Sequence, residues 1–226
     1  MYQASRLIAA ARSNARGAIQ ENGDPRNRFL WHSRGYLPHF EGGETTQIVS
    51  FHLSDSLPHT ALRRMEARLN SVPAKHKDVE RRKRIDALMD AGLGSCILRK
   101  PQVAEMIEHS LLSFDSRRYR LLEWVVMPNH IHVLFQPMDD WTVAKIVSSW
   151  KKFTARMICH SARLGGETAV IPVWHREYWD RYIRNQSPFD KAVDYIRSNP
   201  VKADLIRKPE NWPWSSARFS LGSPIS

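Results

Sequence analysis

The chain has little cysteine and no long apolar run. Its only two cysteines, Cys96 and Cys159, are isolated from each other and from any metal-ligand spacing. A disulfide framework is therefore excluded, and both thiols fit a reducing compartment. No uninterrupted stretch of about 20 apolar residues is present, so we expect no membrane-spanning segment and no membrane partner.

Phosphate-cradling glycine motifs and acidic residues are also scarce. The 10 glycines form no Walker loop and no Gly-rich phosphate-binding turn, so a nucleoside triphosphate site is not indicated. The chain has 34 Lys and Arg but only 23 Asp and Glu, which gives a formal net charge of +11. This excess favours a polyanionic partner, most simply nucleic acid, although a basic surface without a partner is an alternative that composition leaves open.

The length of 226 residues fits one domain with an appendage. We predict a basic, flexible arm over 1–32, a single domain over 33–219 and a tail over 220–226. The arm has the composition of a transit peptide, but Arg12 and Arg16 interrupt any secretory apolar segment. A DNA-contacting arm and a disordered start both remain open.

Periodicity predicts an α+β domain with a basic N-terminal extension. Its elements follow in the order β–α–α–ββ–α–β–α, which implies a small antiparallel sheet covered by helices. They are a strand at 47–53, a charged helical stretch at 60–91 broken at Pro73, a helix from Pro101, strands at 119–126 and 130–136, a helix at 142–163, one strand in the region of the short apolar segment 169–174 and the aromatic block 174–183 that follows it, and a last helix.

The last helix has clear start and stop signals. Ser187 is a suitable N-cap, Pro188 suits the first helical position and Asp190 the first turn. Since Pro200 disfavours helical geometry in the residue before it, we expect the helix to end at Asn199.

Two histidines two residues apart stand in the otherwise apolar segment 124–135. Side chains alternate faces along a strand, so His130 and His132 should project together, with Ile131 on the opposite, buried face. Such a pair is compatible with metal ligands and equally with polar residues of a half-exposed strand. A zinc site would need further donors that no nearby Cys or acidic cluster supplies, and a histidine-triad hydrolase would need a third histidine at Leu134.

Tyr195 and Asn199 are four residues apart in the last helix and so share one face, with Lys191 one turn earlier. Taken alone, this tyrosine fits an interfacial core residue and this asparagine a helix stop. Taken with the histidines, they form a coherent active site. Two imidazoles and an amide oxygen can hold a divalent ion that leaves positions for phosphate oxygens, beside a hydroxyl that can act as a nucleophile.

These residues resemble a known family. Met127-Pro-Asn-His-Ile-His132 is similar to the HUH motif of the IS200/IS605-type single-tyrosine transposases, and the chain most resembles their REP-associated group. The resemblance covers about residues 33–219 and rests on an ordered set of segments: Gly35–Phe40, Phe51–Pro58, Trp174–Arg181, Tyr195–Ala203 and Trp212–Ser216.

The resemblance implies the HUH-endonuclease fold, with a ferredoxin-like palm, and a role for each site residue. His130, His132 and Asn199 would bind Mg²⁺ or Mn²⁺. Tyr195 would be the nucleophile that joins the 5′ phosphate of cleaved single-stranded DNA. The implied activity is metal-dependent cleavage and rejoining in the bacterial cytoplasm, in association with the nucleoid. A domesticated protein that binds hairpins without cutting is the alternative.

The implied partner is single-stranded DNA folded into REP-like hairpins, bound by a monomer or a homodimer. Basic helix faces are candidates for holding its backbone. The residues concerned are Lys145, Lys151, Lys152, Arg156 and Lys191. Two departures from the family pattern concern DNA specificity: His52 stands where Arg is common, and residues 72–95 are longer and more charged than usual.

Overall fold

A computed structural model describes residues 31–33, 38–40, 43–166, 168 and 171–219. Most of the predicted arm and the whole predicted tail lie outside these residues. A short pair of strands, β1 (Trp31–Ser33) and β2 (Pro38–Phe40), precedes the main sheet. The predicted domain boundary between residues 32 and 33 therefore falls inside β1.

The main sheet has four antiparallel strands in the order β4-β5-β3-β6. They are β3 (Gln47–His52), β4 (Tyr119–Val126), β5 (His130–Pro137) and β6 (Trp179–Tyr182). Between β3 and β4 the chain forms a helical hairpin and then a helix that packs on the sheet, and another helix lies between β5 and β6. Apart from the hairpin, this order is that of a ferredoxin-like βαββαβ unit. The predicted α+β class and antiparallel sheet are confirmed.

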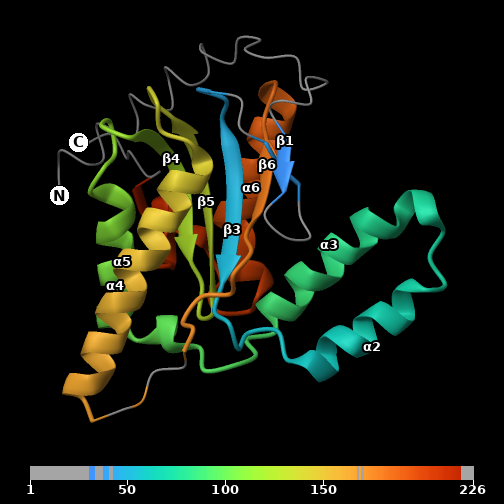
Figure 1. Cartoon of the computed structure of the whole chain (residues 1–226), viewed down its shortest axis with the longest axis horizontal. Helices are drawn as coiled ribbons and strands as arrows, with labels where there is room; N and C mark the ends of the chain where they lie inside the picture. Colours follow the sequence, from blue (N-terminus) through green and yellow to red (C-terminus); the bar gives the residue numbers. More distant parts are fainter. Residues whose placement is uncertain (1–30, 34–37, 41–42, 167, 169–170, 220–226) are drawn as a thin grey trace.

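Helices cover both faces of this sheet (Figure 1). On one face lie α4 (Pro101–Leu112) and α5 (Val143–Leu164), whose side chains join one apolar cluster. The short helix η2 (Ile97–Arg99) leads into α4. The other face is covered by α6 (Gln186–Lys202), which belongs to a second cluster. Every residue of β5 is consequently buried.

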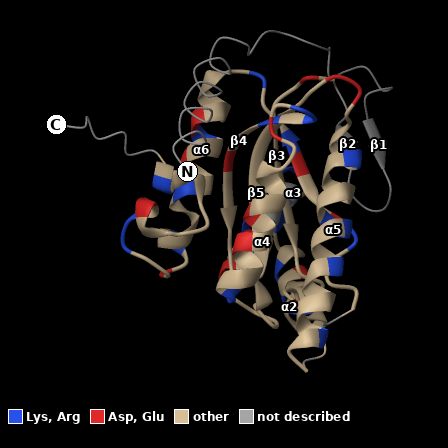
Figure 2. Ribbon diagram, turned by 90° about the vertical axis from the view of Figure 1, so that its left-hand side faces the viewer, with Lys and Arg blue, Asp and Glu red and all other residues tan. Residues whose placement is uncertain are grey.

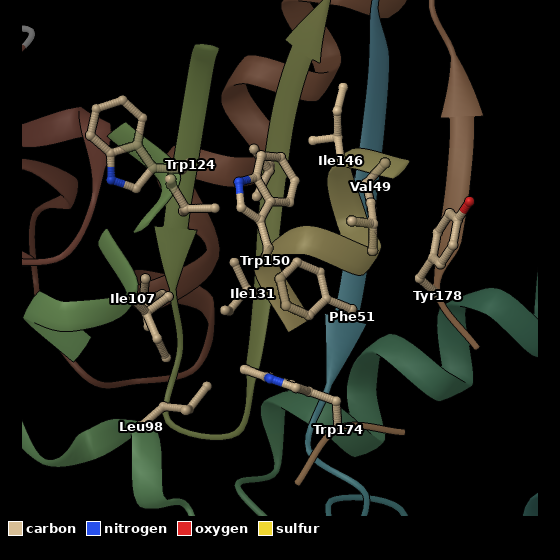
Figure 3. Close-up of a cluster of buried hydrophobic side chains, with 14 of the residues drawn as sticks. Val49, Phe51, Leu98, Ile107, Trp124, Ile131, Ile146, Trp150, Trp174 and Tyr178 are labelled. Carbon is tan, nitrogen blue, oxygen red and sulfur yellow. The ribbon is translucent and has the colours of Figure 1, made fainter. Parts of the chain in front are cut away.

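Successive residues of each strand point to opposite faces of the sheet and so belong to different apolar clusters. On the α4/α5 side, Phe51 and Ile131 pack with Trp150 and Trp174, as Figure 3 shows. The α6 side is apolar around Leu134 and Ile196. Because polar residues of β3 and β5 also point to the α6 side, a polar site can form there between two apolar layers.

A β-bulge in β4 adds one more polar side chain to the α6 side. Leu121 pairs with Phe135, but the next paired residue is Glu123, opposite Leu134. Since Leu122 is the extra residue, Leu122 and Glu123 both face α6, and the alternation resumes with Trp124 on the other side. The bulge thereby aims a carboxylate at α6.

The charged stretch after β3 forms a helical hairpin of α2 (His59–Leu69) and α3 (Ala74–Asp90). Pro73 precedes α3, so the break predicted there is confirmed. Figure 1 shows the hairpin projecting from the body, with α3 running back toward the sheet. A small apolar cluster of Met65, Leu69, Ile85 and Met89 holds the two helices together.

The predicted limits of the last helix were wrong. The helix starts at Gln186, with Asn185 rather than Ser187 as its N-cap, and it runs through Pro200 to Lys202. Pro188 still lies in the first turn, where its missing N–H is not needed. Pro200 is tolerated because it lies in the last turn, where Ala203 N–H still donates to the Asn199 carbonyl at 3.0 Å.

The C-terminal segment closes over β4. It contains η3 (Pro209–Asn211) and η4 (Ser216–Phe219), and Val126 N–H donates to the Trp214 carbonyl at 2.9 Å. Arg218 forms an ion pair with the buried Glu108, at 2.6 Å. Among the described helices, none is both long enough and apolar enough to cross a membrane.

Candidate active site

The two predicted histidines lie side by side on β5, on the face covered by α6. His130 and His132 are both fully buried, and their ring centroids are 4.7 Å apart. Burial lowers the pKa of His132 to about 3. Burial and the neighbouring His132 and His52 also hold the pKa of His130 well below its ordinary value. Both rings are therefore neutral at pH 7, the form in which imidazole binds metals.

Asn129 fixes the proton of His130. The Asn129 amide group donates to the carbonyls of Met89 and Leu93, at 3.1 and 3.0 Å. Its oxygen must then face the His130 ring, and it lies 2.7 Å from Nδ1. Because this oxygen can only accept, Nδ1 carries the proton and the lone pair of Nε2 is directed into the site.

Ser50, on the neighbouring strand, keeps the proton of His132 on Nδ1. Its hydroxyl lies 2.5 Å from His132 Nδ1, and the two residues are register partners on β3 and β5. On the other side of the ring, the amide nitrogen of Asn199 lies 3.4 Å from Nε2. That nitrogen only donates, so Nε2 is the acceptor and Nδ1 carries the proton.

Helix α6 brings Tyr195 and Asn199 to this pair. The Tyr195 hydroxyl lies 3.4 Å from His132 Nε2, and the two ring centroids are 5.0 Å apart. Asn199 is fully buried, whereas Tyr195 is half-buried. The four residues proposed from sequence as ligands and nucleophile thus converge at one place between β5 and α6.

Two carboxylates from α3, which sequence reasoning missed, approach the same place. Asp86 accepts a hydrogen bond from Tyr195, and Asp90 Oδ1 lies 3.6 Å from His130 Nε2. Burial first, and then both carboxylates, raise the pKa of Tyr195 above its ordinary value. Burial also raises the pKa of Asp90 to about 6, against the opposing effect of Lys202. The four-residue spacing of Asp86 and Asp90 on a helix is the only local signal of this arrangement.

Three polar atoms in the site are buried without a hydrogen-bond partner: His130 Nε2, Asn199 Oδ1 and Asp90 Oδ1. All three carry lone pairs and none carries a proton to share, which is a donor set that a divalent cation satisfies. Within the described residues, no three His, Cys, Asp or Glu side chains are close enough to hold a metal ion by themselves. A metal site here therefore depends on the amide of Asn199.

His52, the departure noted in the sequence, lines the same face of the sheet. It pairs with His130 in the strand register and stacks between His175 and Trp179, with ring centroids 4.6 and 5.2 Å away. Its Nδ1 contacts the Leu53 carbonyl at 2.8 Å. Burial, followed by the charge of His175, lowers its pKa to about 3, so His52 is neutral in the fold.

Most of the basic residues predicted to contact DNA lie away from this site. Lys145, Lys152 and Arg156 are exposed on α5, on the opposite side of the sheet, where Figure 2 shows Lys and Arg along the helix. Lys151, also on α5, donates from Nζ to the carbonyls of residues 175–177 at 2.9–3.2 Å. Only Lys191 shares a helix with Tyr195. DNA contact by these residues stays a prediction.

The sequence is similar to those of known transposases. The family model of the IS200-like transposases matches residues 97–199, a range that contains His130, His132, Tyr195 and Asn199. The REP-associated tyrosine transposase of Escherichia coli (strain K12) is 27% identical over 116 residues, which cover 50% of this chain and 63% of that protein. A putative REP-associated tyrosine transposase of Haemophilus influenzae (strain ATCC 51907 / DSM 11121 / KW20 / Rd) is 29% identical over 105 residues, 44% of this chain and 60% of that protein.

The fold is also similar to a solved structure, that of a REP-associated tyrosine transposase bound to a REP hairpin. The TM-score is 0.53 at 20% identity, over 82% of this chain and 84% of the other. The matches to the two curated relatives span less than two thirds of their length. Residues 97–199 thus match the family model of the IS200-like transposases, and the chain is similar in sequence to REP-associated tyrosine transposases.

Proposed function

We propose that this chain is a metal-dependent single-stranded DNA endonuclease and transesterase that acts at REP-type hairpins. The observation that carries the proposal is the convergence of a tyrosine hydroxyl with two histidines and a buried amide. Tyr195 Oη and the Asn199 amide each lie 3.4 Å from His132 Nε2, and His130 lies beside them. The names of the relatives and the hairpin bound by the solved transposase support the choice of substrate.

Tyr195 is the nucleophile in this proposal. Its oxygen attacks the phosphorus of a phosphodiester, forming a Tyr–O–P bond while the bond from phosphorus to the 3′ oxygen breaks. The 5′ phosphate is then joined to the protein, and the 3′ oxygen leaves as a hydroxyl after taking up a proton. Attack by a 3′ hydroxyl on the phosphotyrosine reverses the step, so bond energy is conserved and no nucleotide cofactor is needed.

The phenolic proton needs an acceptor, because the pKa of Tyr195 is raised and the hydroxyl stays protonated at pH 7. Asp86 is the residue we assign to this role, since it already accepts a hydrogen bond from the hydroxyl. Lys202, with Nζ 5.2 Å from the centre of the Tyr195 ring, places a positive charge beside the developing phenolate.

The cation would be Mg²⁺ or Mn²⁺, and Nε2 of both histidines and Oδ1 of Asn199 would hold it. When bound, it would neutralise charge on the phosphate oxygens and lower the energy of the charged transition state. Imidazole ligands favour Mn²⁺, whereas cellular supply favours Mg²⁺. Asn129 and Ser50 hold the two rings in the tautomer that this binding requires.

The test is covalent capture of DNA. A hairpin oligonucleotide from the repeats flanking the gene is labelled on the 3′ side of the expected cut and incubated with the protein and Mn²⁺. We expect the label to migrate with the protein on a denaturing gel, and to be lost with EDTA. Tight hairpin binding with neither adduct nor cleavage in Mn²⁺ or Mg²⁺ would instead support the non-cutting alternative.

A further inference from the structure

We propose that Asp90, at the end of α3, is a fourth donor to the cation of this site. The inference rests on the proposed metal dependence and adds a ligand to it. Asp90 Oδ1 and His130 Nε2 face each other at 3.6 Å. Both atoms are buried, and neither has a hydrogen-bond partner. A carboxylate oxygen and an imidazole lone pair repel each other unless a cation or a proton lies between them.

The orientation of His130 favours the cation. Asn129 holds the proton on Nδ1, so Nε2 offers a lone pair toward Asp90. Asn199 Oδ1 adds a third unpartnered acceptor in the same site. Three acceptors without a donor are better satisfied by one divalent ion than by one shared proton.

The spacing is close to that of two ligands on one ion. Donors each about 2.1 Å from a six-coordinate Mg²⁺ or Mn²⁺ lie about 3 Å apart. At 3.6 Å, Asp90 Oδ1 and His130 Nε2 are slightly too far apart to bind the same ion. This agrees with the absence, among the described residues, of three His, Cys, Asp or Glu side chains placed to hold a metal ion. The Asp90 side chain keeps 24% of its surface exposed, so it can close this gap by rotating.

The hairpin holds Asp90 at this place. Met89, the preceding residue, is buried in the α2/α3 cluster, and its carbonyl accepts from the side chain of Asn129. The same asparagine thus positions both His130 and the end of α3. Helix α3 lies outside residues 97–199, which match the family model. The fourth ligand would therefore come from a segment outside the matched domain.

The experiment measures Mn²⁺ binding to the full chain by titration calorimetry, with free-ion electron paramagnetic resonance as a second readout. We expect Asp90→Asn to weaken the Kd at least 10-fold. Asp86→Asn removes the same charge one helical turn away and should change the Kd less than 3-fold, which separates ligation from general electrostatics. Because the amide of Asn could still bind weakly, Asp90→Ala is the second variant and should lose at least as much.

Thermal unfolding separates a ligand from a structural carboxylate. Without metal, Asp90→Asn should melt at the same temperature as the wild type or higher, because an unpaired buried charge is removed. The increase in Tm that saturating Mn²⁺ gives the wild type should shrink in the variant. An unchanged Kd in both Asp90 variants would overturn the fourth ligand and leave the proposed function intact. His130→Ala is the variant expected to bind no Mn²⁺. If the wild type also binds no Mn²⁺, both the fourth ligand and the proposed metal-dependent function are overturned.

Discussion

Arg197 of α6 forms a bidentate ion pair with Glu123 of β4, with N···O distances of 2.8 and 3.3 Å. Glu123 is 1% exposed and reaches α6 only because of the bulge at Leu122. Arg197 lies on α6 between Tyr195 and Asn199. The pair therefore anchors the proposed nucleophile and the proposed amide ligand to the sheet that carries the histidines.

Replacing Arg197 with Met should destabilise the fold. The change leaves Glu123 buried without its cation, and such a loss costs about 3 kcal/mol when one partner of a buried pair is removed. Arg197 is partly exposed, so we expect about 2 kcal/mol in urea denaturation. Lys191→Met, at an exposed position on the same helix, is the control and should change the free energy of unfolding by less than about 0.5 kcal/mol. Equal stability of the two variants would contradict the anchoring role.

Removing the partners of the histidine Nδ1 atoms should weaken metal binding. Ser50→Ala and Asn129→Ala each allow one ring to place its proton on Nε2 or to rotate. Loss of such a partner typically weakens metal affinity about 10- to 100-fold. Mn²⁺ titration of the two variants measures the effect. Asn129→Ala should also lower the Tm more than Ser50→Ala does, because α3 loses its link to β5 in addition to the hydrogen bond of one histidine. Wild-type Mn²⁺ affinity in both would show that the tautomers are not held this way.

The metal-free protein should lose stability in mild acid. The pKa values of His52 and His132 are about 3 in the fold, against 6.5 when exposed. Between these values the unfolded chain binds more protons, so stability is complete above pH 6.5 and falls toward pH 3, by about 1.4 kcal/mol per pH unit for each histidine. Asp90 acts in the opposite direction, because its raised pKa makes the folded chain take up a proton between about 6 and 3.8.

The effect of the histidines exceeds that of Asp90, because the pKa of His130 is lowered as well as those of His52 and His132. We therefore expect a net loss of at least about 1.4 kcal/mol per unit between pH 6 and 4. Urea denaturation at pH 7, 6 and 5 in EDTA measures it. Constant stability over this range would show that the histidines are more accessible to protons than their burial indicates.

Asp86→Asn should slow cleavage without weakening hairpin binding. Tyr195 would keep a hydrogen-bond partner but lose the group that takes its proton, and general-base catalysis is typically worth about 10²- to 10⁴-fold. Single-turnover cleavage of a saturating hairpin isolates this step. A rate within a factor of three of the wild type would assign the proton to another acceptor.

Local pattern was sufficient to predict the parts of the site within one element. The i, i+2 spacing of His130 and His132 and the i, i+4 spacing of Tyr195 and Asn199 each specify a shared face. The predicted strands at 47–53, 119–126 and 130–136 also agree with β3, β4 and β5 to within one residue. The predicted stop at Pro200 failed because a proline in a final turn removes only one hydrogen bond.

The contacts between distant elements could not be predicted. Ser50 meets His132 through the register of β3 and β5, and Asp90 meets His130 through the packing of a hairpin that the sequence marks only as charged. Likewise, an amphipathic pattern showed that α5 has a polar side but not which face of the sheet it covers. The approach of its cations to the DNA stays a prediction for that reason.

The most direct test of the account is to identify the amino acid joined to DNA. After reaction with a cleavable hairpin and Mn²⁺, the adduct is digested with nuclease and trypsin and analysed by mass spectrometry. We predict a 5′-phosphonucleotide on the peptide of residues 192–197, whose only tyrosine is Tyr195, and no adduct in Tyr195→Phe. An adduct on another residue, or cleavage that leaves free 5′ phosphates and no adduct, would contradict the assignment of Tyr195 as the nucleophile.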